Sequence, residues 1–530
     1  MSPRIAPLLA VSVLGGALLA TPGSMHGRGG VYNQTRHADP VTGVLRISDW
    51  ARGDCGQCHA PHDGSAPTAF ALFAPNTNGL CYTSGCHSGN SANAIYQGPG
   101  SYDASTHATR SGMVWPGADA TLDAAAPRAR PAGDWGKCVN CHDVHGYNMD
   151  GAGLIPSLAV SREERLCLVC HDGSPAARNI KAEVNKAARH PVASSGRHSA
   201  AEAGTPGAYG AGPPDRRHAE CVDCHNPHYA RAGSPTPATT SYPIMGVGRI
   251  SVLNGPAGST PAFTYVPASS VTPPVAEYQL CFKCHSSWTS LPVGARDTAV
   301  EFNTNNESFH PVEGAGRNTT AAMTASLSGG TGTPRLTTSS TIWCSDCHNS
   351  DAIPTTVSTL SGYSGAVPKG PHGSNVGSAD VNLSRKILRA NYRVTLLPSN
   401  AAYSASNFTL CFICHASAPF ADASKRSRPD TNFRLHGYHM TDIAGESGGV
   451  AGSLDTPGNG RAGQGNAVCK ECHYTLHGTR LTYHEANRSY SRLVSFSPSI
   501  SGPGGTGAPS WTGKSCSLRC HGKAHSPKTY

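Results

Sequence analysis

The chain has 530 residues, with 42 lysines and arginines against 33 aspartates and glutamates, so its formal charge is +9. It contains 60 glycines and 40 prolines, and only 14% of its residues are charged. Aliphatic runs are few, so the chain has little material for a large apolar core of its own, which argues against a conventional globular enzyme. No basic block interleaved with aromatic residues is present, and this argues against nucleic acid as a partner.

The N-terminus carries a basic residue, Arg4, followed by an apolar run over residues 5–20. This pattern predicts a secretory signal peptide at residues 1–24 and a mature region at 25–530. The run is short for a membrane span, and no later stretch is long and apolar enough to cross a bilayer. We therefore expect export without a transmembrane anchor, to the cell surface or the extracellular space, with the periplasm as the alternative.

Ten copies of Cys-x-x-Cys-His, or of a close variant, use all 20 cysteines. In chain order they are Cys55, Cys58 and His59; Cys81, Cys86 and His87; Cys138, Cys141 and His142; Cys167, Cys170 and His171; Cys221, Cys224 and His225; Cys281, Cys284 and His285; Cys344, Cys347 and His348; Cys411, Cys414 and His415; Cys469, Cys472 and His473; and Cys516, Cys520 and His521. This is the attachment signal for c-type haem, in which both thiols bond to the cofactor. The adjacent histidine ligates its iron.

Other interpretations of these motifs are weaker. Zinc sites built from Cys-x-x-Cys pairs do not need a histidine after every second cysteine. A disulfide between cysteines three residues apart would be strained. Two motifs have longer spacing, with four residues between Cys81 and Cys86 and three between Cys516 and Cys520. Both keep the terminal Cys-His, and the extra residues can bulge outward. The sequence therefore predicts ten covalently attached haem c groups.

Ten haem macrocycles would supply the apolar core that the polypeptide lacks. We expect a fold that is mostly coil with short α-helices wrapped around a linear stack of ten haems, with little β-structure, and a folding free energy that depends on the cofactor. Successive first cysteines lie 26 to 67 residues apart, so no gap can hold a separate haem-free domain of typical size. Ionised propionates would shift the charge from +9 to about −1 oxidised and about −11 reduced.

The motifs alternate in type, which reveals an internal repeat. Leucine-type motifs follow a leucine and begin at Cys81, Cys167, Cys281 and Cys411; polar-type motifs begin at Cys55, Cys138, Cys221, Cys344 and Cys469. A spacer histidine lies between the two types, and a trailing histidine follows most polar-type motifs. The unit of leucine-type motif, spacer histidine, polar-type motif and trailing histidine occurs four times. A lone polar-type motif precedes these units, and a lone motif ends the chain.

Several local elements can be predicted along the repeat. A capping box at residues 161–164 should open a helix that leads into the motif at Cys167. Residues 181–189 form a second helical stretch that should stop before Pro191. Segments 328–340 and 501–510 are rich in Gly, Ser, Thr and Pro and are predicted to be surface loops.

A six-coordinate iron needs a second axial ligand, and repeat position nominates ten histidines for this role. They are His37, His62, His107, His145, His190, His228, His310, His372, His436 and His477. His26 rivals His37, His439 rivals His436, and His484 or His525 could serve the last haem. Methionines do not recur in phase with the repeat, so low-potential bis-histidine haems are expected.

A trailing histidine should not ligate the haem of its own motif. His62 lies about one helical turn beyond His59, so both side chains project from the same side of the segment. His59 would already occupy one face of its haem, and the porphyrin would block access to the other. One short peptide would then join two haems.

These elements resemble the doubled Cys-x-x-Cys-His family of multihaem c-type cytochromes. The resemblance rests on Leu-Cys-x-x-Cys-His, His-Pro-Val, Cys-x-x-Cys-His-x-Pro-His and Gly-Pro-His-Gly and covers residues 37–525. The chain is also similar to extracellular, filament-forming (nanowire) cytochromes of metal-reducing bacteria. That resemblance implies electron transfer from other cytochromes or redox proteins to extracellular acceptors such as metal oxides. In that group a histidine of one subunit can ligate a haem of the next.

We expect an electron-transfer protein rather than an enzyme. The alternative is a multihaem reductase of a small oxyanion or nitrogen compound, which would need a haem with an open axial position. Histidines are in excess here, which disfavours that alternative. An incomplete half-unit at each end is compatible with a head-to-tail homopolymer. The competing possibility is a monomer in which His484 or His525 ligates the tenth haem.

Overall fold

The structure is a computed structural model. It describes residues 32–60, 71–83, 85–87, 102–110, 136–146, 163–192, 219–231, 242–267, 276–289, 291, 294–328, 336–356, 367–397, 403–421, 435–437, 439–440, 466–479, 491–512, 515–520 and 523–529. The predicted signal peptide and the capping residue Ser161 lie outside these ranges, as do His26, His62, His484 and His521.

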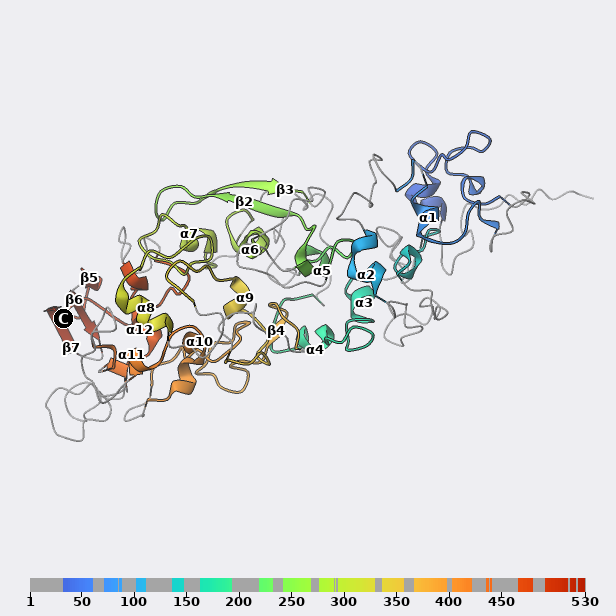
Figure 1. Cartoon of the computed structure of the whole chain (residues 1–530). Coiled ribbons are helices and arrows are strands. Elements are labelled where there is room, and N and C mark those ends of the chain that lie inside the picture. Colours follow the sequence, from blue (N-terminus) through green and yellow to red (C-terminus); the bar gives the residue numbers. More distant parts are fainter. Residues whose placement is uncertain are drawn as a thin grey trace, which may run out of the picture. The chain divides into compact units, whose positions relative to one another are not determined.

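The described helices are short, and the longest, α6, has nine residues. They are α1 (Asn78–Cys81), α2 (Thr106–Thr109), α3 (Glu163–Leu168), α4 (Ile180–Glu183), α5 (Cys221–Cys224), α6 (Glu277–His285), α7 (Thr298–Phe302), α8 (Ala321–Ser328), α9 (Cys344–Cys347), α10 (Thr409–Phe412), α11 (Ala418–Ala421) and α12 (Cys469–Cys472). The chain between them is mainly turns and irregular segments (Figure 1). The predicted fold class, mostly coil with short helices and little strand, is confirmed.

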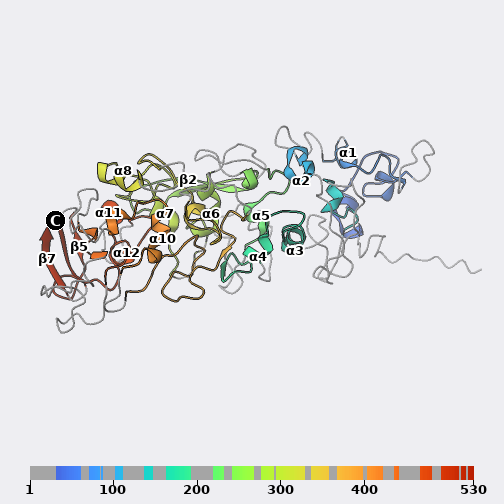
Figure 2. The ribbon, with the colours of Figure 1, turned by 60° about the horizontal axis from the view of Figure 1, so that its bottom comes forward.

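The strands form three small antiparallel sheets. They are β1 (Ala188–Arg189), β2 (Arg249–Leu253), β3 (Ala262–Val266), β4 (Gly373–Ser374), β5 (Ser510–Trp511), β6 (Ser515–Cys520) and β7 (Lys523–Thr529). Strand β1 pairs with β4, β2 with β3, and the order of the third sheet is β5-β6-β7. Figure 2 shows β5 and β7 at the C-terminal end of the chain.

The chain divides into two compact units. The first comprises residues 1–94, 117–129 and 137–162, and it carries the motifs that begin at Cys55, Cys81 and Cys138. The second comprises residues 95–116, 130–136 and 163–530 and carries the other seven motifs. Each unit is described by itself below.

Apolar packing in the second unit is split into small clusters. Helix α6 lies beside the β2–β3 hairpin (Figure 1). Ile250 and Phe282 belong to the cluster between them, and Tyr265 stacks on Trp288 with ring centroids 6.2 Å apart. Another cluster lies around Leu410 and takes in the motif cysteines 411, 414 and 469, which are half-buried. Motif cysteines therefore border the polypeptide's own apolar clusters.

The first unit holds its motif loop largely through one polar side chain. Gln57, inside the first motif, is fully buried. Its side-chain oxygen accepts hydrogen bonds from the main-chain N–H groups of Arg46 and Ile47, and its amide nitrogen donates to the carbonyl oxygens of Ile47 and Trp50. A single buried amide thus ties the N-terminal loop to the motif.

Two local predictions have different outcomes. Helix α3 (Glu163–Leu168) forms where the capping box predicted a helix. The helix predicted at 181–189 is wrong, because α4 ends at Glu183 and residues 188–189 form β1 instead. Strand β1 pairs with Gly373 and Ser374, almost two hundred residues away. These non-local hydrogen bonds override the local helical propensity.

The two predicted loops are partly supported. Residues 504–508 are exposed irregular chain, in agreement with a surface loop. Residue 328 still belongs to α8, and residues 329–335 lie outside the described part of the chain. Among the described helices, none is long and apolar enough to cross a membrane.

Candidate metal centres

A helical turn brings the cysteines of most motifs together. The N–H of the motif histidine donates to the carbonyl oxygen of the first cysteine, at 2.9 Å for His59, 2.8 Å for His348 and 2.8 Å for His473. In such a turn, residues three and four apart lie on one face with Cβ atoms about 5–6 Å apart. Both thiols and the histidine are thereby directed to one side of the segment.

The second intervening residue of the polar-type motifs closes this turn from the other end. In four of the five motifs its side chain accepts a hydrogen bond from the main-chain N–H of the residue before the first cysteine, which stabilises the start of the turn. The pairs are Lys137 to Asn140 at 2.7 Å, Glu220 to Asp223 at 2.7 Å, Trp343 to Asp346 at 3.0 Å and Val468 to Glu471 at 2.8 Å. The recurring Asn, Asp or Glu at this position is a sequence signal that motif recognition alone missed.

The long motif at Cys81 keeps the same closure. The N–H of His87 donates to the carbonyl oxygen of Cys81 at 3.1 Å, despite the two extra residues. Gly85 is exposed, has a φ of +85° and has open space where a Cβ would be. The insertion is therefore accommodated by an outward turn that needs glycine.

The last motif has a different local structure. Cys516, Leu518 and Cys520 lie on strand β6, where alternate residues share a face. Cys516 and Leu518 are buried and Arg519 is exposed, so the three-residue spacing puts both cysteines on the buried face. Four steps along a strand separate their Cα atoms by about 13 Å. The structure thus does not gather this cysteine pair as it gathers the others.

The structure places motif histidines beside the predicted second ligands. The ring centroids of seven pairs lie 6.0–6.4 Å apart: His37 and His87, His59 and His145, His107 and His171, His190 and His285, His225 and His372, His348 and His477, and His436 and His473. An iron atom bound at about 2 Å from one nitrogen of each ring separates the ring centroids by about 6 Å. The rings present therefore fit a six-coordinate haem iron between them.

Six of the seven pairs follow a regular register; in the seventh, the spacer histidine His436 lies beside the polar-type His473. Polar-type histidines face the trailing histidine of the next polar-type motif, as His59 faces His145 and His225 faces His372. Leucine-type histidines face the preceding spacer histidine, as His171 faces His107. None of these three motifs faces its own trailing histidine.

Two nominated histidines, His228 and His310, lie outside the seven pairs. His310 lies close enough to His415 to lower the pKa of that ring. His228 packs against the ring of Tyr102, with centroids 6.0 Å apart. Of the rivals, His436 faces His473, whereas Nδ1 of His439 lies 2.9 Å from the Leu435 carbonyl oxygen. His525 lies on β7, opposite Leu518 of β6.

Burial favours the neutral form of four of the motif and trailing histidines. Desolvation, aided by neighbouring histidines, lowers the pKa to about 4 for His171, His348 and His415 and to about 3 for His372. Neutral imidazole is the form that binds metal. In the described part of the chain, no group of three or more His, Cys, Asp or Glu side chains is placed to hold one metal ion.

Many of these rings are oriented through Nδ1 by the main chain. The Nδ1 atoms of His107, His190, His225, His348 and His473 lie 2.6–3.0 Å from the carbonyl oxygens of Pro227, Pro371, Pro243, Ile387 and Leu493, respectively. Nδ1 of His310 contacts the Leu476 carbonyl oxygen in the same way. Such contacts fix the tautomer and leave Nε2 available for the metal.

Neighbouring motifs meet through their cysteines. The first thiol of each leucine-type motif is in hydrogen-bonding contact with the first thiol of the following polar-type motif: Cys81 with Cys138, Cys167 with Cys221, Cys281 with Cys344 and Cys411 with Cys469. The second thiols of a polar-type motif and the next motif are electrostatic neighbours: Cys58 and Cys86, Cys224 and Cys284, Cys347 and Cys414, and Cys472 and Cys520. Within each unit, consecutive motifs are therefore adjacent in space.

Two segments of the chain, residues 49–92 and 131–176, match the family described as the doubled CXXCH motif. Both segments are doubled CXXCH motifs. The first contains the motifs at Cys55 and Cys81, and the second contains those at Cys138 and Cys167. CXXCH motifs indicate covalently bound c-type haem, and their doubling is characteristic of multihaem c-type cytochromes in electron transfer. No curated protein and no solved structure matches the chain.

Proposed function

We propose that this chain is an electron-transfer protein that carries ten covalently attached haem c groups with histidine on both sides of each iron. The observation that carries the proposal is the set of seven histidine pairs with centroids 6.0–6.4 Å apart. When bound, the haems supply the one-electron chemistry. The protein supplies two thioether bonds, two axial ligands and a surrounding of low polarity for each.

On this proposal, the ring pairs supply most of the second ligands. They are His145 for the motif at Cys55, His37 for Cys81, His107 for Cys167, His372 for Cys221, His190 for Cys281, His477 for Cys344 and His436 for Cys469. His310 takes the motif at Cys411, in keeping with its proximity to His415.

Electron transfer between successive haems is supported by the alternating cysteine contacts. A thioether bond ties each thiol to the edge of a haem, so two thiols in contact bring two haem edges close together. In the second unit such contacts run without interruption from Cys167 to Cys520. Electrons would then pass from motif to motif in chain order.

The ligand assignment can be tested with His145→Ala. We expect all haems to stay attached, because the thioethers are untouched, while one iron becomes five-coordinate, high-spin and able to bind carbon monoxide. His439→Ala is the matched control, since the nearby His436, and not His439, lies beside the motif histidine His473. An unchanged spin state in His145→Ala would contradict the assignment. High-spin haem in the unaltered protein would favour the reductase alternative.

The haem count can be tested by the intact mass of the mature protein, which should exceed the polypeptide mass by ten haems. The C-terminal motif decides this number, because β6 separates Cys516 from Cys520. Haem attachment there requires that this strand give way to a turn. A mass of nine haems, unaffected by Cys516→Ser, would show that the extended strand is retained.

We further propose that the protein is exported and assembles head to tail, with extracellular acceptors. The signal-like N-terminus supports export. What supports assembly is that, within residues 1–530, the register pairs His62 with no polar-type motif and pairs the motif at Cys516, which His525 follows, with no later trailing histidine. His62 of one copy would then serve the last haem of its neighbour, while His37 is engaged internally with His87. A contact of this kind that does not close into a ring gives a filament.

Electron microscopy of secreted His62→Ala would test assembly. We expect single molecules in place of filaments, with His439→Ala as the filament-forming control. Filaments that persist in His62→Ala would contradict this junction, and a wild-type protein that stays monomeric would contradict assembly altogether. Neither result would affect the electron-transfer assignment.

A further inference from the structure

One of the paired histidines has a carboxylate as its Nδ1 partner. Nδ1 of His477 donates to Oε2 of Glu301 at 2.8 Å, and Glu301 is only 1% exposed. Oε1 of the same carboxylate accepts from the Arg296 guanidinium at 3.3 Å. The ring of Phe302 packs against His477 with centroids 4.9 Å apart. We name Arg296, Glu301 and His477 the Glu301 pocket.

The repeat contains an equivalent arrangement around His372. The N–H of His190 donates to the carbonyl oxygen of His372 at 3.3 Å, just as the N–H of His310 donates to that of His477 at 2.9 Å. The glycine after each of these trailing histidines abuts the carbonyl oxygen of a glutamate, Glu183 for Gly373 and Glu301 for Gly478. Glu183 therefore occupies the position of Glu301.

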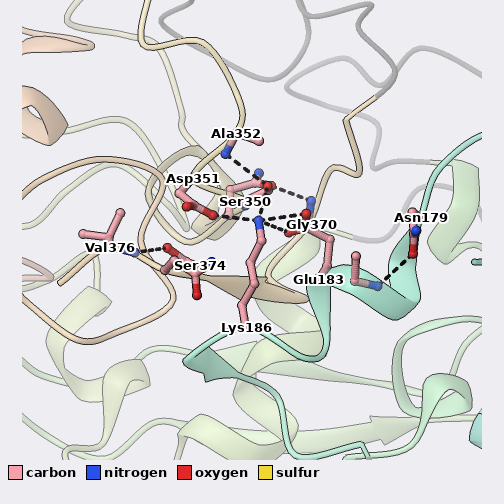
Figure 3. A network of polar contacts seen from close by, with 12 residues as sticks. Asn179, Glu183, Lys186, Ser350, Asp351, Ala352, Gly370, Ser374 and Val376 are labelled. Carbon is pink, nitrogen blue, oxygen red and sulfur yellow. Dashed lines mark hydrogen bonds and ion pairs between the residues drawn. The ribbon is translucent and has the colours of Figure 1, made fainter. Parts of the chain in front are cut away.

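In this second arrangement the glutamate binds a lysine and not the trailing histidine. Nζ of Lys186 binds Glu183 at 2.8 Å, Asp351 at 2.7 Å and Ser350 at 3.1 Å (Figure 3). Nδ1 of His372 is buried and has no hydrogen-bond partner among the described residues. We name Glu183, Lys186, Asp351 and His372 the Glu183 pocket. Its carboxylate is held by a lysine, whereas the carboxylate of the Glu301 pocket is bound to the ligand.

A carboxylate that accepts a hydrogen bond from Nδ1 changes the basicity of the histidine ligand. The charge-assisted hydrogen bond draws the Nδ1 proton toward Glu301, so the imidazole becomes more basic at the metal-binding nitrogen. A more basic ligand stabilises the ferric state relative to the ferrous state. The almost complete burial of Glu301 limits screening by water, so the effect on the ligand is strong.

On the basis of the proposed function, we infer that Glu301 is a positioning residue that lowers the reduction potential of the haem between His348 and His477. This potential would lie below that of the equivalently built haem between His225 and His372. Two haems with the same ligands and the same repeat position would then differ in potential, which creates an uphill step for an electron inside the chain.

The test is a spectroelectrochemical titration of the full-length holoprotein and of Glu301→Gln. Glutamine keeps a hydrogen-bond acceptor for Nδ1 but removes the charge. We expect one one-electron component to shift upward, so that the reduced-to-oxidised ratio of that haem at a fixed potential rises about tenfold, or about 59 mV for a one-electron couple. Glu183→Gln is the matched control, and it should leave that component in place.

A second variant separates tuning from a purely structural role. Arg296→Gln removes the positive charge that competes for the Glu301 carboxylate, so the same component should shift downward, opposite to Glu301→Gln. His477→Ala identifies the component, because its haem becomes high-spin. Identical redox titration curves for the wild type and both charge variants, with full haem content and low-spin spectra, would overturn this inference and leave the proposed function intact. Absence of covalent haem in the wild type would overturn the proposed function as well.

Discussion

The Glu183 and Glu301 pockets are two copies of one backbone arrangement with different electrostatics. In both, a His-Pro-Val segment pairs with the segment of a trailing histidine, and a glycine lets that segment touch the carbonyl of a glutamate. In one copy the glutamate binds Lys186, and in the other it binds His477. The comparison shows that the repeat conserves where the ligand lies, while the residues between the motifs determine its electronic environment.

The shared backbone should make both pockets equally intolerant of a side chain at the glycine. A Cβ at Gly478 would lie 1.8 Å from the Glu301 carbonyl oxygen, and one at Gly373 would lie 1.9 Å from that of Glu183. Because backbone must move in each case, we expect Gly478→Ala and Gly373→Ala each to lower the free energy of unfolding by about 3 kcal/mol.

Thermal unfolding of the holoproteins would measure this effect. Gly504→Ala is the matched control, because nothing lies within 4 Å of its Cβ position, and it should change stability by less than about 0.5 kcal/mol. A large loss in one pocket and none in the other would break the equivalence of the two pockets.

The pockets should differ in how much stability their cations contribute. The side chain of Lys186 is 14% exposed and faces two carboxylates, whereas that of Arg296 is 31% exposed and faces one. Burial lowers the pKa of Lys186, but the hydrogen bonds that it donates to Asp351 and Glu183 outweigh burial and raise the pKa above its usual value. Lys186→Met leaves Glu183 without its cation and should cost about 2 kcal/mol.

Arg296→Met should cost less than about 1 kcal/mol, because Arg296 is the more exposed cation and Glu301 keeps its hydrogen bond from His477. Chemical denaturation of the two variants tests the difference. Adding Glu183→Gln to Lys186→Met should restore part of the lost stability, because the unpaired charge is then removed. Equal losses for Lys186→Met and Arg296→Met would contradict the contrast between the pockets.

The stability of the protein should depend on pH through a glutamate that only one of the two repeat copies has. Glu313 follows His310-Pro-Val, whereas alanine stands at the matching position after His190. Burial raises the pKa of Glu313 to about 7, against a hydrogen bond from Asn254 that lowers it. The folded protein therefore binds a proton here that the unfolded chain releases near pH 4.5.

Stability should consequently fall as pH rises from about 4.5 to about 7 and then level off, by about 1–2 kcal/mol from this group. Glu313→Gln should remove this part of the slope. The midpoint of unfolding should be measured at pH 5 and pH 8 for the wild type and for Glu313→Gln. An identical pH dependence in the two proteins would contradict a contribution from Glu313.

The sequence predicted which histidines take part in the pairs better than it predicted which motif each of them faces. Repeat position alone nominated His145 and His372, because such histidines recur at a constant place after a motif. It could not tell which motif each one faces, since the partners lie 86 and 147 residues away (145 − 59 and 372 − 225) and are joined only by tertiary packing.

Local structure was predictable only where local bonds decide it. The helix at α3 formed, but residues 188–189 became a strand because β4 supplies non-local hydrogen bonds. The strand at Cys516–Cys520 was likewise not expected, although a three-residue spacing places both cysteines on one face of a strand. The carboxylate of Glu301 had no sequence signal, since it acts through a residue 176 positions away.

An experimental density map of the holoprotein would reveal the ligand register directly. We expect iron between His225 and His372 and another iron between His348 and His477, with the trailing histidine supplied by the next polar-type motif in each case. An iron held by His348 and His372, the trailing histidine of its own motif, would contradict the register and the comparison built on it.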